Sequence, residues 1–342
     1  MPTERAPPVS RAAGLGPPDP AAIGAWPAGG GQPLAAAARG PAGAGVAAGR
    51  MLLRRFLRHR LGVISAGVLV VLALACLAAP LVAALLGHDP NLVDLFGRFA
   101  GPSASHPLGT DELGRDLLLR LLYGGQVSLF VGLVGAVAAS VLGTLIGVVA
   151  GYVGGRIDAL LMRLTDAVIA LPMLPLLIVL AAVDLTKLGI PDDLAHSESA
   201  SLYRILLIVV LAGWTTVARL VRGATLSVRE HDFVRAAVAL GARPVRIMVA
   251  HLLPNIASPI IVATTLSVGG VILTESVLSF LGLGIQPPLP SWGNMLTNAQ
   301  ELIWQAPQLA IYPGLLIFVT VIAFNFVGDA LQDAMDPRAH EP

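Results

Sequence analysis

Six long apolar runs, separated by short polar segments, occupy the chain from residue 61 onward. A helix needs about 20 mostly apolar residues to cross the hydrocarbon core of a bilayer. The pattern therefore predicts an all-α integral membrane protein with six transmembrane helices, at residues 61–86, 126–152, 160–183, 203–220, 256–283 and 309–331. The third run carries LPMLP at its centre, so we expect that helix to kink there.

The polar segments between the runs divide the chain. Residues 1–50 are Ala, Gly and Pro with scattered polar residues, a composition that predicts a disordered tail. Residues 51–125 hold the first transmembrane helix and a polar loop. Residues 126–331 form a five-helix core interrupted by a second polar loop at residues 222–255, and residues 332–342 form a C-terminal tail.

Basic residues are unevenly distributed between the two sides of the predicted bundle. With the N-terminus placed inside, the inner segments hold 17 Arg and Lys residues and the outer segments hold five. Positive charge concentrates on the cytoplasmic side of membrane proteins. Both termini are therefore predicted to be cytoplasmic, and so is the loop at residues 222–255.

Composition agrees with a membrane protein and limits the chemistry available to it. The chain is 55% hydrophobic and 13% charged, with a net charge of +1, and no nucleic-acid partner is predicted. Its single lysine, Lys187, lacks the glycines that a GxxxxGK[ST] phosphate loop requires. We find no metal-binding or nucleophile motif, so the chain is predicted to be neither an enzyme nor a cofactor-binding protein, and any ATP would be bound by another subunit.

The polar loop before the fifth run is the segment richest in functional signals. Phe233, Ala237 and Leu240 fall on one face of a predicted short helix, and Ala236 beside them has almost no side-chain bulk. Gly241 can take the left-handed conformation that ends a helix, and Pro254 marks the return to the membrane. The simpler interpretation is a basic inner loop that only obeys the charge rule.

Spacing within this loop indicates more than charge. The alanine pair, Gly241 and the LP pair at Leu253–Pro254 resemble the EAA loop of ATP-binding-cassette importer permeases. Arg235 stands where that family usually has Glu, and His251 where it often has an apolar residue. Three more segments resemble the dipeptide and oligopeptide permeases of the same family: HPLGTDELGRDLLLRLLYGGQVSL at 106–129, LTESVLSFLGLGIQPPLPSWGNML at 273–296 and NFVGDALQDAMDPR at 325–338.

This resemblance implies a fold, a set of partners and an activity. The fold would be that of a type I importer permease in a bacterial plasma (inner) membrane. The partners would be a second homologous permease, two ATPase subunits that use ATP and Mg, an extracytoplasmic solute-binding protein, and the lipid bilayer. Substrate, most simply a di- or oligopeptide, would cross by alternating access. Nickel chelates, glutathione or another small solute are alternatives within the same family.

The same resemblance assigns the site residues. The coupling helix that docks on the ATPase would comprise Phe233, Arg235, Ala236, Ala237, Leu240, Gly241 and Pro254. The outer surface that receives the binding protein would include Asp111, Glu112, Arg115, Asp116 and Trp292. The simpler interpretation of the first four is a capped, interfacial helix start, with Thr110 or Asp111 as the cap. That of Trp292 is an aromatic anchor at the membrane interface.

Asp166 and Glu275 fall inside predicted spans, where charge is costly and usually functional. Asp166 lies three residues after Arg163, and the two are expected to pair; a role in the translocation pathway is the alternative. Glu275 has no evident local partner, and we consider both the translocation cavity and the interface with the partner permease for it. A secondary transporter remains a different class of explanation, although no internal repeat supports it.

Overall fold

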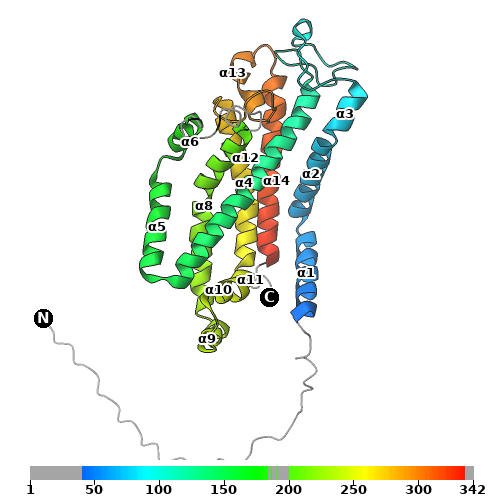
Figure 1. Ribbon diagram of the computed structural model, residues 1–342. Helices are drawn as coiled ribbons and strands as arrows, with labels where there is room; N and C mark the ends of the chain where they lie inside the picture. The colour runs from blue at the N-terminus through cyan, green and yellow to red at the C-terminus, as the bar shows by residue number, and fades with distance from the viewer. Residues whose placement is uncertain (1–40, 184–185, 187–190, 192–199, 336–342) are drawn as a thin grey trace, which may run out of the picture. The chain divides into compact units, whose positions relative to one another are not determined.

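The computed structural model describes residues 41–183, 186, 191 and 200–335. Internal contacts divide the chain into a short N-terminal unit, Met1–Ala48, and a main unit, Gly49–Pro342. The main unit is an elongated helical bundle, and the described residues contain no strand beyond one isolated bridge between Thr110 and Asp116 (Figure 1). The predicted all-α class is confirmed.

Four long helices form the centre of the bundle. They are α4 (Leu117–Val153), α8 (Ala200–Arg229), α12 (Ala257–Phe280) and α14 (Gln308–Met335). Helix α2 (Arg60–Leu77) packs along α14, and α5 (Gly155–Ala170) and α6 (Met173–Ala182) lie against α8. Among the described residues, five of these helices are long and apolar enough to cross a membrane, and there are six spans if the bent α5–α6 pair counts as one.

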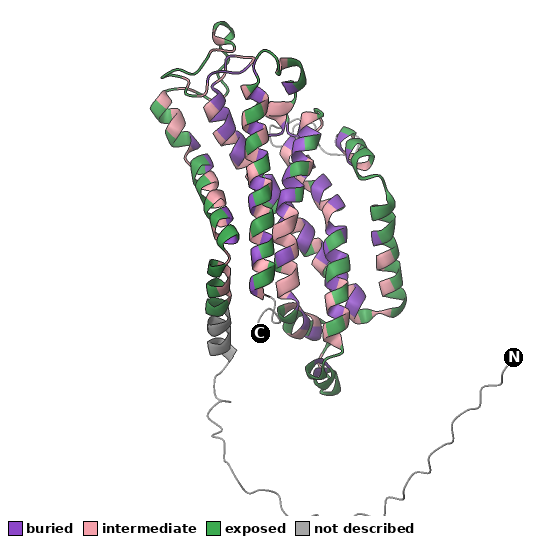
Figure 2. Ribbon diagram, turned by 180° about the vertical axis from the view of Figure 1, so that it is seen from behind, coloured by how far each residue is buried: buried purple, intermediate pink, exposed green. Residues whose placement is uncertain are grey.

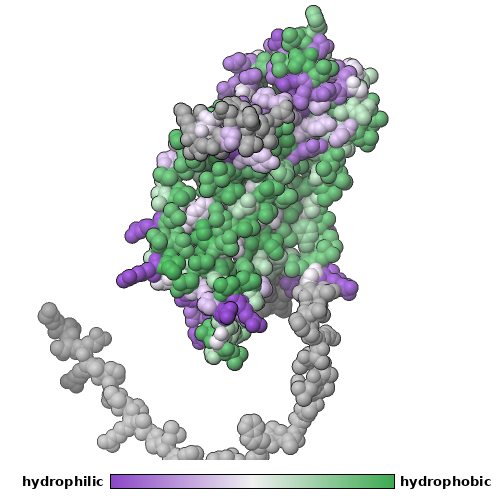
Figure 3. All heavy atoms as spheres, in the orientation of Figure 1, coloured by the Kyte–Doolittle hydropathy of each residue, from purple (hydrophilic) through white to green (hydrophobic). Residues whose placement is uncertain are grey.

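Exposure and hydropathy follow the pattern of a membrane protein. Exposed residues cover the outward faces of the helices, while buried ones line their mutual contacts (Figure 2). Hydrophobic residues cover the middle of the visible face, and hydrophilic ones gather at its two ends (Figure 3). One end carries the short helix α9 (Asp232–Ala239), and we call it the α9 end. The other carries the connector between α12 and α14, residues 281–307, and we call it the connector end.

Small residues let α4 and α8 approach closely. A side chain added at Gly143 or Gly147 would lie 2.5 Å from the carbonyl oxygen of Trp214 or 2.6 Å from that of Ala218. Gly151 continues the same four-residue spacing toward Thr225. Small residues at this spacing are the usual means of close helix packing in lipid, where hydrophobic burial supplies no driving force between helices. This contact holds the centre of the bundle together.

The predicted spans match the observed helices in order, with the bent α5–α6 pair at the place of the third span, but differ in their ends. The first run is two helices, α2 and α3 (Ala79–Leu86), because Pro80 cannot continue the hydrogen bonding of α2. The third run bends by 89° between α5 and α6, at Leu171-Pro172, as predicted. Helix α8 continues to Arg229, so residues 222–229 of the predicted 222–255 loop are helical and continuous with the fourth span.

Both predicted tails require correction. Residues 41–50 open α1 (Pro41–Arg58), so the prediction of disorder is wrong for them, and residues 1–40 lie outside the described residues. Apolar and basic residues alternate at helical spacing from Arg50 onward, which explains the helix. At the other end α14 continues to Met335, so the C-terminal tail begins later than residue 332, and residues 336–342 lie outside the described residues.

Candidate functional site

The principal candidate site is the short helix α9 together with the helical segment that follows it, residues 244–255, which we call the mount. Val234, Ile247 and Leu252 are almost fully buried and form an apolar cluster that fastens α9 to the helical segment after it. That segment runs through α10 (Pro244–Arg246), a π-helical stretch (Ile247–Leu252) and α11 (Leu253–Asn255). Its widened turns precede Pro254, which has no N–H to donate. The mount therefore links α9 directly to the start of α12.

The turn after α9 depends on glycine. Gly241 has φ +77°, a left-handed conformation that residues with side chains rarely adopt. Its N–H donates to Val238 O at 2.9 Å, and the N–H of Ala242 donates to Ala237 O at 3.0 Å. These bonds satisfy the last carbonyls of the helix, as in other glycine-ended helices. Gly241 thus ends α9 as the sequence indicates.

The outward face of α9 borders a groove of about 870 Å³. Phe233 is 42% exposed and Leu240 is 88% exposed, while Ala236 between them leaves the helix backbone accessible. Ala237 lines the groove but is itself 9% exposed, so the outward face is formed by residues 233, 236 and 240 rather than by the predicted 233, 237 and 240. The remaining lining is Gly241, Ala242, Arg243, Arg246 and His251.

Arg235, which stands in place of the usual glutamate, pairs with Glu230. It is exposed, and its Nη2 donates to Glu230 Oε2 at 3.0 Å. Hydrogen bonds from Arg235, and then from Arg229, hold the pKa of Glu230 below its ordinary value. Because the folded pKa is lowered, this contact is present at neutral pH and is lost as the pH falls through that lowered pKa.

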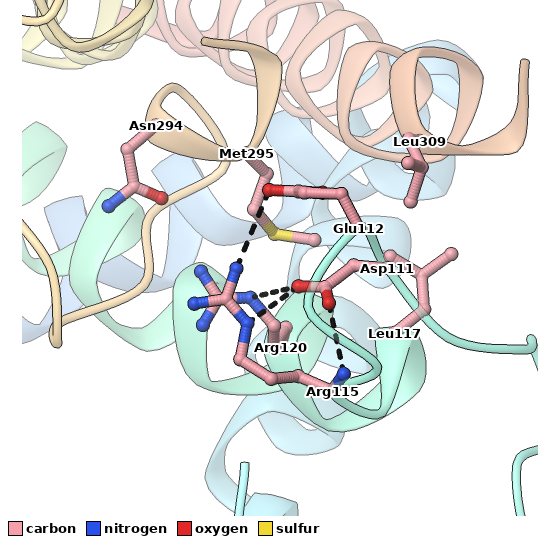
Figure 4. Close-up of a pocket in the computed structure, with 8 residues that line it drawn as sticks. All are labelled: Asp111, Glu112, Arg115, Leu117, Arg120, Asn294, Met295 and Leu309. Atoms are coloured by element: carbon pink, nitrogen blue, oxygen red, sulfur yellow. Dashed lines mark hydrogen bonds and ion pairs between the residues drawn. The ribbon is translucent and has the colours of Figure 1, made fainter. Parts of the chain in front are cut away.

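The segment GTDELGRD, residues 109–116, folds into a tight cap over the start of α4, which we call the α4 cap. Asp111 accepts hydrogen bonds from the N–H groups of Leu113 and Arg115, both at 2.9 Å, and from Arg115 Nε at 2.7 Å. Its carboxylate lies between the guanidinium groups of Arg115 and Arg120 (Figure 4). Gly114 is required because a side chain there would overlap the carbonyl oxygen of Asp94.

Asp116 is the N-cap of α4, so the predicted cap at Thr110 or Asp111 is wrong by several residues. Its Oδ1 accepts from the N–H of Leu119 at 2.8 Å, and its Oδ2 lies 2.9 Å from Nδ1 of His106. Asp111 and Asp116 are 3% and 2% exposed. Their carboxylates are therefore engaged inside the chain. Glu112 and Arg115 are the partly exposed members of the predicted outer surface.

A small cavity of about 30 Å³ separates the α4 cap from the connector. Its charged lining is Asp111, Glu112, Arg115 and Arg120, and Figure 4 shows Asn294, Met295 and Leu309 around the same space. Among the described residues no acceptor lies within hydrogen-bonding distance of Nη1 of Arg120, a buried side chain. Arg120 contacts Asp111 at 3.4 Å through Nε. Charged side chains therefore lie between the α4 cap and the connector.

Trp292 does not present its ring to lipid, as an aromatic anchor would, because the ring is buried inside the chain. Its side chain is fully buried, its Nε1 donates to Leu121 O at 2.9 Å, and its ring packs against Gly125. A Cβ at Gly125 would overlap both the ring and Cys76 Sγ. Trp292 therefore fixes the connector to α4.

Asp166 and Glu275 have hydrogen-bond partners that the sequence did not indicate. Asp166 Oδ1 accepts from Arg219 Nη2 on α8 at 2.5 Å, so the expected pairing with Arg163 is wrong. Both of these side chains are about half exposed. Glu275 is fully buried within the chain and accepts from Ser279 Oγ at 2.7 Å, so the expectation that it lacks a local partner is also wrong.

One ion pair at the α9 end escaped sequence reasoning. Arg222 of α8 donates to Asp158 of α5 through two hydrogen bonds, Nε to Oδ1 at 2.5 Å and Nη2 to Oδ2 at 2.6 Å. The residues are 64 positions apart, so no local spacing could have indicated the pair. It fastens the first half of the bent span to the helix that leads into α9.

Two family models match parts of the chain, and one solved structure is similar to it. Residues 143–341 match the family described as binding-protein-dependent transport system inner membrane component, and residues 48–102 match the N-terminal TM domain of oligopeptide transport permease C. Among solved structures, the MetNI methionine ABC transporter in inward-facing conformations is similar with a TM-score of 0.48 and 16% identity, covering 62% of this chain and 96% of that chain.

Several characterised relatives are similar over most of their length. The dipeptide transport system permease protein DppC of Alkalihalophilus pseudofirmus is 36% identical, over 84% of this chain and 90% of its own. The oligopeptide transport system permease protein OppC of Bacillus subtilis is 34% identical, over 83% and 88%. The glutathione transport system permease protein GsiD of Pectobacterium atrosepticum is 37% identical, over 84% and 91%. The chain therefore belongs to the family of binding-protein-dependent transport system inner membrane components.

Proposed function

We propose that this chain is one of the two membrane subunits of an ATP-driven importer and that its substrates are di- or oligopeptides. A second homologous permease would complete the pathway, and two ATPase subunits would bind ATP and Mg. A solute-binding protein would deliver the substrate from outside. The family and the names of the dipeptide and oligopeptide relatives support this assignment. The chain itself would act as a transport subunit without catalytic residues.

The α9 groove is the observation that carries the coupling role. The exposed side chains of Phe233 and Leu240 border the groove. Between them, Ala236 leaves the helix backbone open to close approach by another protein. Exposed apolar residues rimmed by polar ones are typical of protein-binding surfaces. Because α9 is attached to the segment that enters α12, a displacement of the docked partner would be transmitted to that span. The proposed partner for this groove is an ATPase subunit.

Charge around the groove indicates what the partner surface should carry. Arg243 and Arg246 line it, while Arg235 is occupied by Glu230. An acidic rim on the ATPase would complement the two lining arginines. Arg235 in place of glutamate changes the charge outside the groove, so docking through the small residues and the glycine turn would be retained.

Orientation follows from the distribution of arginine. The α9 end carries the basic segments, and we propose that it faces the cytoplasm with both termini. The connector end with the α4 cap would then face outward, where Glu112 and Arg115 are accessible to the binding protein. Asp111, Asp116 and Trp292 would support that surface from inside the fold.

A hollow on the membrane-spanning part is a candidate wall of the translocation pathway. It measures about 230 Å³ and lies between α4, α6, α8 and α12. Small and hydroxyl-bearing residues line it, among them Gly213, Thr216, Ser267, Gly270 and Thr274. Such a wall would tolerate peptides of varied sequence, because it presents no charged side chain. Glu275 does not line this hollow, while Asp166, half exposed on α5, stays a candidate for the permease interface.

Glutathione is the second candidate substrate, because a glutathione permease is as similar to the chain as the dipeptide permeases are. Purification of the assembled complex in mild detergent, with mass spectrometry of its subunits, tests the proposal. Recovery of a second permease and of ATPases with phosphate loops is expected. Uptake of a labelled dipeptide, competed by unlabelled dipeptide but not by glutathione, would then assign the substrate. Transport by the purified chain alone without ATP would contradict the importer assignment.

A further inference from the structure

Glu275 lies in an unusual environment for an acidic residue. It is in the last two turns of α12, it is fully buried, and its hydrogen-bonding neighbours are serine hydroxyl groups rather than a basic side chain. A buried carboxyl group is costly unless its oxygens are hydrogen-bonded. Neither the proposed ATPase contact nor the proposed pathway uses this residue.

Two of the serines connect the carboxyl to the connector. Ser279 Oγ donates to Glu275 Oε1 at 2.7 Å and accepts from the N–H of Ile285 at 3.1 Å. Ser128 Oγ, on α4, donates to Glu275 Oε2 at 3.4 Å and accepts from the N–H of Trp292 at 3.1 Å. A backbone N–H can only donate, so each of these hydroxyl groups is left with its own hydrogen free for the carboxyl.

Glycines bring the connector within reach of these serines, since a Cβ at Gly284 would overlap Ser279 Oγ and one at Gly293 would lie 2.6 Å from the Cα of Ser276. Two connector amides are therefore held by hydroxyl groups that converge on one carboxyl.

We propose that Glu275 is a positioning residue that orients these two hydroxyl groups, which we call the serine relay (Ser128 and Ser279). Because both carboxyl oxygens accept hydrogen bonds, the hydrogen of each of these hydroxyl groups points toward Glu275. A lone pair of each hydroxyl oxygen is then directed toward a connector N–H. The connector is thereby held against α4 and α12 through its own backbone. This role requires no contact of Glu275 with the partner permease or with the substrate pathway.

Replacing Glu275 by glutamine keeps the size and shape of the side chain but exchanges one acceptor oxygen for a donor nitrogen. In Glu275→Gln the new side chain would keep one acceptor oxygen, but its amide nitrogen would donate to a serine that already accepts a connector N–H. The hydrogen of that serine would then lose its acceptor, because the amide nitrogen carries no acceptor lone pair. The variant should therefore weaken part of the connector while leaving the packing of α12 unchanged.

The consequence for transport rests on the proposed function. The connector forms the outer end of the bundle beside the α4 cap, so its position would define the outer opening between the two permeases. A loosened connector would leave the ATPase contact at the α9 end intact. We expect slower uptake in Glu275→Gln even though the subunits assemble normally.

Hydrogen–deuterium exchange on the assembled complex in lipid nanodiscs tests the proposal without relying on transport. Glu275→Gln should raise the exchange rate at least tenfold in the peptide that contains Ile285 or in the one that contains Trp292, with no change in α4 or α12. Ser279→Ala should act at Ile285 alone, and Ser128→Ala at Trp292 alone. Adding Glu275→Gln to Ser279→Ala should produce no further increase at Ile285.

Ser276→Ala is the matched control. Ser276 Oγ lies 3.5 Å from Glu275 Oε2, and among the described residues no connector amide donates to it, so its removal should leave connector exchange as in the wild type. Wild-type exchange in Glu275→Gln would overturn the relay, and so would an increase spread over the whole bundle. Altered exchange together with normal uptake would retain the relay but contradict its role in transport, which separates failure of this inference from failure of the proposed function.

Discussion

At the residue scale, the buried carboxylates of the α4 cap have hydrogen-bond partners inside the chain. Asp116 caps α4 and contacts His106, and Asp111 organises the α4 cap through Arg115. These contacts account for the residue types in GTDELGRD: two acceptors for free amides, a glycine where no side chain fits, and an arginine to balance the carboxylate. The carboxylates of Asp111 and Asp116 are therefore unavailable for direct contact with a partner protein.

Asp116→Ala should lower the stability of the protein by about 1–2 kcal/mol, because it removes the N-cap bond to Leu119 and the contact with His106. Thermal unfolding in detergent, followed by tryptophan fluorescence, measures the change. Glu112→Ala is the control, since its partly exposed carboxylate lies 3.6 Å from Arg115. A surface pair of this kind contributes about 0–1 kcal/mol. Equal losses in the two variants would show that the cap is not the stabilising feature.

At the element scale, contacts between helices determine how motion can pass through the bundle. Glycines set the spacing of α4 and α8, and the Asp158–Arg222 pair fastens α5 to α8 beside the segment that leads to α9. The bent α5–α6 pair is thus held at its α9 end by charge. Helix α9 itself has a separate apolar mount, so docking forces reach α12 by a different route.

Gly147→Val should separate α4 from α8, because its Cβ would lie 2.6 Å from Ala218 O, a backbone atom that cannot move away alone. Overpacking of this kind costs about 1–3 kcal/mol or more. We expect a lower Tm and a reduced yield of monodisperse protein. Gly223→Val on α8 is the matched change, as no atom lies within 4 Å of its added Cβ. A Tm for Gly147→Val as high as that of the control would refute the close contact.

Exchanging the charges of Asp158 and Arg222 tests the connection between α5 and α8. Asp158→Arg and Arg222→Asp should each lower the Tm, and the double variant should recover part of the loss, with a coupling energy of about 1–3 kcal/mol. Unfolding of the four proteins in one detergent provides the cycle. Additive losses would mean that the two charges do not interact.

Much of this architecture was predictable from sequence, and what was not has a common cause. The span order, the bend at Leu171-Pro172 and the turn at Gly241 depend on local apolar length, proline and glycine. The burial of Trp292, the partner of Asp166 and the serines around Glu275 depend on residues far away in the chain, such as Ser128, 147 positions from Glu275. Ser279 was the exception, since its i+4 spacing from Glu275 is readable in the sequence.

At the scale of the whole molecule, the two ends of the bundle have different tasks in the proposed importer. The α9 end presents a groove on a rigid mount, and the connector end is closed over α4 by the α4 cap and by Trp292. The long helices α8 and α12 join the two ends. Alternating access then requires only that an ATPase contact α9 differently in its two states, because a partner shifts an equilibrium by its difference in affinity between them.

Site-specific labelling at α9 tests the central claim most directly. Cys76, the one cysteine of the chain, is 2% exposed, so Leu240→Cys introduces a single accessible thiol on a side chain that is 88% exposed. We predict that a maleimide labels this thiol rapidly in the isolated subunit and at least tenfold more slowly in the complex with its ATPases. Trp304→Cys, at the 94% exposed Trp304 of the connector end, should label at equal rates in both. Equal labelling of Leu240→Cys in the two samples would contradict the coupling role of α9.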